Sequence, residues 1–200
     1  MQTLKQLDAT DFGEWARHVN RQNAESGHDG RPLFSPLTGG ADYATSERRA
    51  RFETSIVIPV GTAGWMRCWG LVDDQGAIVG HLDVSASTIV SEQHRVSLGI
   101  GLESAYYRQG FGRALMNHAI GFAQDHGIEW IDLQVLAENT PAMALYKSMG
   151  FIESGHRADR FRINGRSVDD VMMTLKLSTR PVPNAPAAQP PDPTPRSQRS

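Results

Sequence analysis

The chain has 200 residues, 40% of them apolar, and a formal net charge of −2 at pH 7. This length and apolar content suffice for one domain with an ordinary buried core. The near-neutral charge leaves no electrostatic footprint for nucleic acid or an anionic membrane, and no stretch reaches the roughly 18 apolar residues of a membrane span. We therefore expect a soluble protein with neither nucleic acid nor membrane as a partner.

Residues 1–8 carry no apolar signal core and read as a first strand, so we expect a cytoplasmic protein. The single cysteine, Cys68, lies in an apolar run and has no partner for an internal disulfide. We interpret it as a small buried residue rather than as a nucleophile.

A first helix is predicted from Asp8 or Thr10 to about Asn23. Its apolar face, at three- and four-residue spacing, consists of Phe12, Trp15, Ala16 and Val19. Residues 24–43 are rich in Gly and Pro and form a longer segment than a simple connection in a compact domain needs. The favoured interpretation is an ordered loop over a cleft, with Phe34 near an acceptor substrate, and the alternative is a floppy linker.

The remaining elements follow from apolar patterning, turn residues and helix caps. Helices are predicted at 47–52, 110–126 and 140–150. Strands are predicted at about 65–72, 76–87, 94–102, 128–136, 151–157 and 168–177. One domain then covers residues 1–177, and the Pro-rich residues 178–200 form a disordered tail.

A candidate anion site lies where strand 94–102 runs into the turn before helix 110–126. The first N–H groups of a helix have no intrahelical partner, and Gly110 and Gly112 let the backbone approach phosphate oxygens. Arg108 and Arg113 bracket the turn with positive charge. The turn alone leaves a second interpretation open, in which the glycines only shape the connection.

Two commoner phosphate motifs do not fit this chain. A Walker loop needs a Gly-Lys-Ser/Thr ending, which the sequence lacks. The dinucleotide fingerprint needs a small residue three positions after Gly112, where Leu115 stands.

Taken together, two segments resemble the GNAT superfamily of N-acetyltransferases. Tyr107 to Gly112 matches the acetyl-CoA loop, and Asn139 to Phe151 matches the later helix with its Leu-Tyr and Gly-Phe pairs. Gly155 to Arg157 and Asn164-Gly165 look like parts of the closing hairpin. The resemblance covers about residues 65–177, with one departure: Tyr107 stands where many members have Gln or Arg.

The resemblance implies an α/β (α+β) fold, with a mixed, mostly antiparallel central sheet flanked by helices in a single domain. It implies acetyl-CoA as co-substrate and no metal. The strand before the loop would splay from its neighbour and offer its backbone to the thioester arm at Ile100 and Leu102. The pyrophosphate would rest on Arg108, Gln109, Gly110, Phe111, Gly112 and Arg113.

By the same resemblance, Tyr146 is the general acid that protonates the departing thiolate, and Asn139 binds the cofactor arm. Tyr146 as a packing residue and Asn139 as a helix-start residue are the alternatives. Some members carry a catalytic Glu where this chain has Gln134, which accepts no proton. The base must then be sought elsewhere, with His81, Asp83, His94 and Glu103 as candidates, directly or through water.

The sequence thus predicts acetyl transfer to a primary amine by direct attack in a ternary complex. The acceptor would be an amino acid, a small amine or a protein N-terminus. The oligomeric state stays open, with a homodimer among the options. One rival is a catalytically silent acyl-CoA-binding sensor or scaffold, and another is a nucleotide-binding enzyme that uses the same Gly turn.

Overall fold

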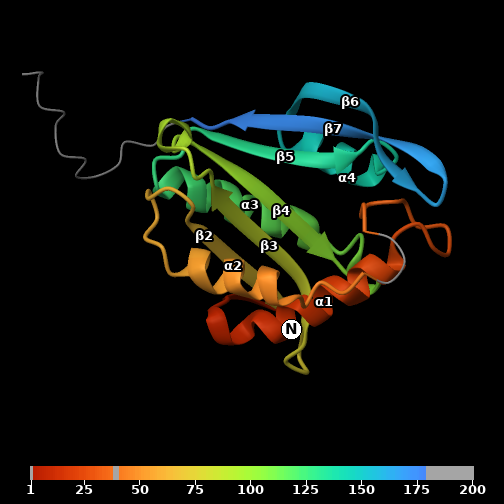
Figure 1. Ribbon diagram of the computed structural model, residues 1–200, viewed down its shortest axis with the longest axis horizontal. Helices are drawn as coiled ribbons and strands as arrows, with labels where there is room; N and C mark the ends of the chain where they lie inside the picture. The colour runs from red at the N-terminus through yellow and green to blue at the C-terminus, as the bar shows by residue number, and fades with distance from the viewer. Residues whose placement is uncertain (1, 38–40, 179–200) are drawn as a thin grey trace, which may run out of the picture.

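A computed structural model describes residues 2–37 and 41–178 of the chain (Figure 1). Its strands form one seven-stranded sheet in the order β1-β2-β3-β4-β5-β7-β6. They are β1 (Thr3–Gln6), β2 (Met66–Val72), β3 (Ile78–Ala86), β4 (Arg95–Leu102), β5 (Trp130–Leu136), β6 (Ile152–Ile163) and β7 (Arg166–Lys176). Adjacent strands of this sheet run antiparallel except β4 and β5, which are parallel. The mixed, mostly antiparallel sheet predicted from the sequence is confirmed.

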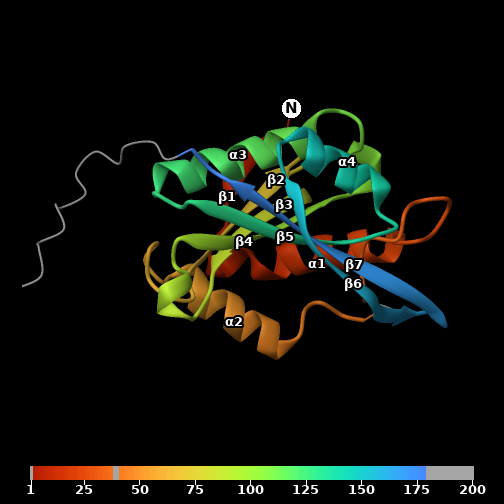
Figure 2. The ribbon, with the colours of Figure 1, turned by 90° about the horizontal axis from the view of Figure 1, so that it is seen from above.

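The helices cover both faces of the sheet. They are α1 (Phe12–Glu25), α2 (Ser46–Ile56), α3 (Phe111–Asp125) and α4 (Thr140–Ser148). Figures 1 and 2 show α1 and α2 on one face and α3 and α4 on the other. A core cluster lies under each pair, around Met116 and Ile131 on the α3 side and around Phe12 and Phe52 on the α1 side. No helix among the described residues is long and apolar enough to cross a bilayer.

The first helix follows its sequence pattern closely. Asp8 caps a 3-10 turn at Ala9–Asp11, and α1 continues from Phe12 with the predicted apolar face buried. Cys68 packs into the same core and is fully buried, as expected, and burial raises the pKa of its thiol well above the ordinary value.

The sheet splits where β4 and β5 separate. Parallel pairing joins them only from Arg95–Ser97 to Trp130–Asp132, while β4 stays paired with β3 up to Leu102. Beyond the split β5 pairs with β7 through Leu136. Residues 98–102 therefore have no strand partner on the β5 side, and the predicted splay is present (Figure 1).

The closing hairpin and α2 differ from their predicted bounds. The predicted strands 151–157 and 168–177 extend towards each other until a tight turn at Asn164 (φ 52°) and Gly165 (φ 77°) joins them. Such an Asn-Gly pair fits a hairpin of primed turn type, so no long loop is needed. The helix predicted at 47–52 runs to Ile56, since Phe52 and Ile56 share a buried face one turn apart.

Two expectations fall partly outside the described residues. Of the predicted loop 24–43, residues 38–40 are not described, and residues 24 and 25 belong to α1. Of the predicted tail 178–200, the structure describes Ser178 alone.

Candidate active site

The turn after β4 ends in an uncapped helix N-terminus. A 3-10 turn at Ser104–Tyr106 leads to Gly110, which adopts a left-handed conformation (φ 87°) before α3 begins at Phe111. No side chain caps α3, so its first N–H groups are free to bind an anion. The segment predicted to hold the pyrophosphate therefore has the unpaired N–H groups that an anion site needs, and the binding itself stays a prediction.

The side chains around this turn have separate structural contacts. Gln109 Nε2 donates to the Ala105 carbonyl over 2.9 Å. Arg113 donates to Ser148 Oγ over 2.9 Å, which ties the start of α3 to the end of α4. Arg108 has a left-handed backbone (φ 58°), and its side chain has no hydrogen-bond or ion-pair partner among the described residues.

Gly112 has a packing role that the motif did not predict. A Cβ built on Gly112 would lie 3.1 Å from Cδ2 of Leu145 on α4. The absent side chain thus lets α3 approach α4 as well as leaving room for a ligand at the helix start.

The helix α4 presents both of its predicted site residues. Asn139 Oδ1 accepts from the Ala142 N–H over 3.3 Å, so the helix-start interpretation of Asn139 is realised. Tyr146 is 7% exposed and packs 6.0 Å from the Phe151 ring, centroid to centroid. Burial raises the pKa of Tyr146 to about 12, which keeps the hydroxyl protonated and able to donate at neutral pH.

A cavity of about 490 Å³ opens in the split between β4 and β5. Its lining includes Ser97 and Leu98 of β4, Gln134 of β5 and Met172 of β7. Gln134 Oε1 accepts a hydrogen bond from Arg157 Nη2 over 2.7 Å. This bond fixes the orientation of the uncharged Gln134 side chain in the cavity wall. The cavity joins the free edge of β4 to the closing hairpin.

The four candidate bases lie in different places. His81 and Asp83 stand on one face of β3, opposite Gly101 and Gly99 of β4. Ideal Cβ atoms at these glycines would lie 2.4 Å from His81 Cε1 and 2.3 Å from Asp83 Oδ1, so both side chains occupy space that the glycines leave free.

His94 is at the other end of the strand. It directly precedes β4, and its carbonyl accepts from the N–H groups of Glu129 and Trp130. The structure therefore does not bring His94 together with the other candidates.

Asp83 is a carboxylate without a hydrogen-bond donor in the described part of the chain, and it is only partly exposed. Burial raises the pKa of Asp83 to about 6, with a smaller opposing effect of Arg51. At neutral pH it is mostly ionised and suited to receive a cationic group.

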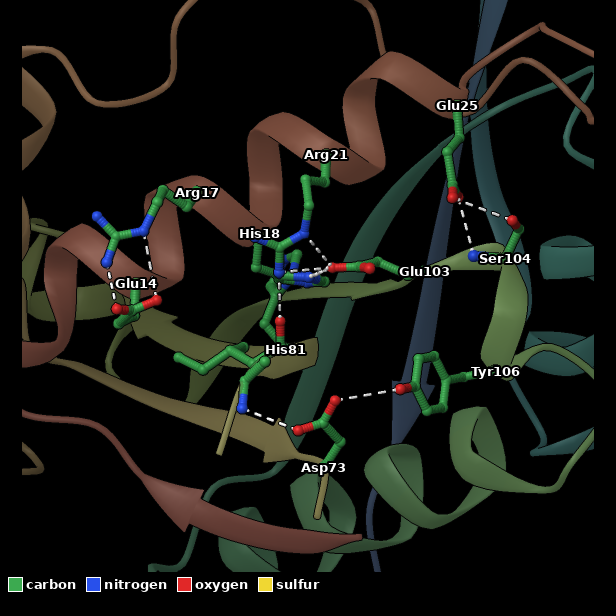
Figure 3. Close-up of polar contacts among 12 residues, drawn as sticks. Glu14, Arg17, His18, Arg21, Glu25, Asp73, His81, Glu103, Ser104 and Tyr106 are labelled. Carbon is green, nitrogen blue, oxygen red and sulfur yellow. Dashed lines mark hydrogen bonds and ion pairs between the residues drawn. The ribbon is translucent and has the colours of Figure 1, made fainter. Parts of the chain in front are cut away.

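Glu103 belongs to a polar cluster that sequence reasoning missed in part. His18 Nδ1 lies 2.8 Å from Glu103 Oε1, and His18 Nε2 lies 3.0 Å from His81 Nδ1 (Figure 3). Gln22, one turn further along α1, is also buried, and its amide oxygen would lie 2.2 Å from a Cβ on Gly101. The available signal was two polar residues, four apart, on the apolar side of α1.

The loop before α2 is anchored through its backbone. Ser26 Oγ accepts from the N–H groups of Phe34 and Ser35, and Leu33 packs against a small cluster with Leu136 and Val168. At the other end of the loop, Tyr43 stacks edge-on against Trp15 with 5.3 Å between ring centroids. The contact of Phe34 with an acceptor stays a prediction.

No group of three or more His, Cys, Asp or Glu side chains is placed to hold a metal ion within residues 2–37 and 41–178.

Comparison with known proteins adds to this geometry. Residues 41–151 match the Acetyltransferase (GNAT) family. The chain belongs to the GNAT superfamily of N-acetyltransferases. Curated relatives include the [ribosomal protein bS18]-alanine N-acetyltransferase of Escherichia coli K12, 33% identical over 50% of this chain and 67% of that protein. The L-amino acid N-acetyltransferase AaaT of the same organism is 30% identical over 49% of this chain and 61% of its own.

Solved structures share the fold of this family member. A GNAT-family acetyltransferase of Streptococcus pneumoniae superposes with a TM-score of 0.76 at 23% identity, over 88% of this chain and all (100%) of that one. A phosphinothricin acetyltransferase of Sinorhizobium meliloti, solved in complex with AcCoA, gives 0.74 at 19% identity over 96% and 97% of the two chains. At these identities the likeness shows the fold alone.

Proposed function

We propose that this chain transfers an acetyl group from acetyl-CoA to a primary amine by direct attack in a ternary complex. The observation that carries the proposal is the free edge of β4, residues 98–102, which leads directly to the uncapped N-terminus of α3. An open strand edge suits the amides of an extended cofactor arm, and a helix N-terminus suits a pyrophosphate.

The cofactor residues follow from that arrangement. Backbone groups at Ile100 and Leu102 bind the thioester arm, while the pyrophosphate rests on residues 108–113. Asn139 is a weaker candidate for a cofactor contact, because its side-chain oxygen already caps α4. Its amide nitrogen has no hydrogen-bond partner within residues 2–37 and 41–178 and is the group that would bind the arm.

Tyr146 donates from its hydroxyl to the departing sulfur. Its pKa of about 12 lies above that of a thiol, about 8.5, so full proton transfer to a free thiolate would be uphill. We therefore propose that the hydroxyl first stabilises charge on the sulfur through a hydrogen bond and gives up its proton as water replaces it.

The proposed acceptor is an amine that is cationic in solution and enters the cavity beside β4. Asp83 offers its ionised carboxylate near Gly99, and Trp15 and Tyr43 contribute aromatic faces on the α1 side. Relatives named for a ribosomal-protein alanine, an L-amino acid and, in Vibrio cholerae, spermidine all act on amines and support this class.

Two measurements test the proposal. Calorimetry should give tighter binding of CoA than of ATP or NAD. Release of free thiol from acetyl-CoA should then depend on an amine from a panel containing an Ala-starting peptide, L-amino acids and spermidine. Binding without turnover on any amine would favour the silent acyl-CoA-binding module, and tighter binding of ATP or NAD would contradict the cofactor assignment.

A further inference from the structure

A hydrogen-bonded chain of side chains links Glu103, His18 and His81. Its distances are 2.8 Å from Glu103 Oε1 to His18 Nδ1 and 3.0 Å from His18 Nε2 to His81 Nδ1. His18 is completely buried (0% exposed) and His81 is 9% exposed, whereas Glu103 lies nearer the surface beside Arg21. Figure 3 shows His18 and Arg21 pointing from α1 towards Glu103, with His81 beyond them on the strand.

The partners fix where the protons lie. The Glu103 carboxylate lies 2.9 Å from Arg21 Nη2 and offers acceptor oxygens, so it accepts from His18 Nδ1–H. His18 Nε2 is then a bare acceptor, and His81 must donate to it from Nδ1. This arrangement needs both rings neutral, and burial does lower the pKa of each imidazole to about 3.

One lone pair is left over, on His81 Nε2. No described residue bonds to this nitrogen, and it is not among the fully enclosed polar atoms, so solvent reaches it. Its ring lies over Gly101, where any larger residue would collide with it. Gly101 belongs to the free edge of β4, so the open nitrogen stands beside the strand segment proposed above for the thioester.

We propose that His81 Nε2 is the base that takes the proton from the attacking amine, and that His18 and Glu103 store this proton during the reaction. The inference rests on the proposed acetyl transfer and names a group that performs one step of it. Glu103 and His18 act through His81 and are positioning residues, because the proton enters the hydrogen-bonded chain at His81 Nε2.

The proposed proton transfers begin at the acceptor. The acceptor ammonium passes one proton to His81 Nε2, the neutral nitrogen then bonds to the thioester carbonyl carbon, and the surplus proton of the resulting intermediate leaves to water. The Nδ1 proton of His81 moves to His18, and the Nδ1 proton of His18 moves to Glu103. The C–S bond then breaks with its electron pair on sulfur, which gains a proton from Tyr146, and water restores Tyr146. After product leaves, the shifts reverse and His81 Nε2 returns the stored proton to water.

The hydrogen-bonded chain of Glu103, His18 and His81 avoids the cost of charging a single buried histidine. A proton kept on His81 would create an imidazolium away from water, which the surroundings disfavour. The coupled shifts leave both rings neutral and place the proton on Glu103, the most exposed of the three groups. The charged groups around the rings are Glu103, Arg21 and, two residues along β3, Asp83.

The first test compares His81→Asn with the control His118→Asn on α3, which lies on the opposite face of the sheet. With acetyl-CoA and the best amine of the panel above, His81→Asn should lose about 10²-fold or more in kcat and keep its affinity for CoA within about twofold. The loss should shrink as pH approaches the pKa of the acceptor ammonium. The control should stay within about threefold of the wild type.

Glu103→Gln provides a second variant at a less buried position. Its amide can donate to His18 Nδ1 and reverse both tautomers, so we expect a loss of at least about tenfold in kcat without a change in melting temperature comparable to a core defect. Wild-type turnover in His81→Asn would overturn the proposal. So would equal losses of CoA affinity and kcat, which would indicate a purely structural network.

A nitrogen NMR measurement on the imidazoles of the wild type needs no acceptor. His81 should be protonated at Nδ1 and bare at Nε2 at pH 7, and a proton found on Nε2 would overturn the proposal. If the wild type acetylates no amine while His81 shows the expected tautomer, the proposed function fails and the assignment of the bare nitrogen stands. If both the wild type and His81→Asn are active, acetyl transfer stands and only the role of His81 as base is contradicted.

Discussion

At the scale of single residues, Tyr146 gives the most direct test of the chemistry. Tyr146→Phe removes the hydroxyl and keeps the ring that packs against Phe151. Turnover should fall by about 10²- to 10⁴-fold, the usual effect of a positioned acid, while CoA affinity persists. Single-turnover kinetics separates the chemical step from product release. A loss of stability without a selective rate effect would favour the packing role.

Asp83 gives a second prediction, in which stability and binding move in opposite directions. Its folded-state pKa of about 6 lies above the ordinary 3.8, so the folded protein binds the proton more tightly and loses stability as pH rises between these values. Asp83→Asn removes this loss of stability. The variant should therefore be more stable than the wild type by at most about 3 kcal/mol at pH 8 and about equally stable at pH 3. Thermal melting at the two pH values measures it.

The same variant should bind a cationic acceptor less well. We expect a higher Michaelis constant for the amine and an unaltered one for acetyl-CoA, because Asp83 faces Gly99 rather than the α3 N-terminus. Asp125→Asn, at the far end of α3, is the control for loss of one carboxylate. A rise confined to acetyl-CoA would place the acceptor site elsewhere.

At the scale of elements, short sequence signals predicted the features that depend only on neighbouring residues. The Gly110 turn and the apolar face of α1 are each encoded within a few adjacent residues. The length of the closing hairpin was underestimated, because residues 158–160 are exposed and interrupt the alternation of a half-buried strand. For the same reason the Asn-Gly turn was recognised as part of a hairpin and its strands were not extended to it.

The histidine chain was beyond the reach of sequence reasoning. His18 and His81 are 63 residues apart, and His18 and Glu103 are 85 apart, so only the packing of α1 on β3 and β4 brings them together. His81 and Glu103 were candidates from the sequence, whereas His18, which connects them, was hidden on a helix face interpreted as apolar.

The start of α3 carries a prediction about the cofactor. Gly112→Val should weaken CoA binding by a few kcal/mol if several N–H contacts to phosphate are lost at about 1 kcal/mol each. It should also lower stability, because its Cβ lies 3.1 Å from Leu145. Calorimetry on Gly112→Val and on the smaller Gly112→Ala separates the two effects.

Gly121→Ala, in the same helix, is the matched control, since a Cβ there meets nothing within 4 Å. It should leave CoA affinity unchanged and raise stability by about 0.5–1 kcal/mol, as expected for Gly to Ala inside a helix. Unaltered CoA affinity in Gly112→Val would remove the pyrophosphate from this turn.

At the scale of the whole molecule, the buried imidazoles predict acid sensitivity. The pKa of His18 and that of His81 are lowered from 6.5 to about 3, so below pH 6.5 the unfolded chain takes up protons that the folded chain does not. The stability that neutral burial provides is thus full above pH 6.5 and falls as pH decreases towards 3. At pH 5 each histidine accounts for a loss of about 2 kcal/mol.

Asp83 opposes this trend from about pH 6 downward, because its proton uptake on folding stabilises the native state there. With two histidines against one carboxylate, the net loss of stability remains, and it begins before Asp83 starts to titrate.

Denaturant unfolding at pH 7.5, 6.5 and 5 should therefore show a free energy of unfolding that is lower at pH 5 than at pH 6.5. His81→Asn should flatten the decrease by about 2 kcal/mol, whereas His156→Asn, at a side chain that is 57% exposed, should not alter it. A decrease of the same size in the wild type and in His81→Asn would mean that His81 is already charged in the folded protein, which would also remove the bare nitrogen on which its role as base depends.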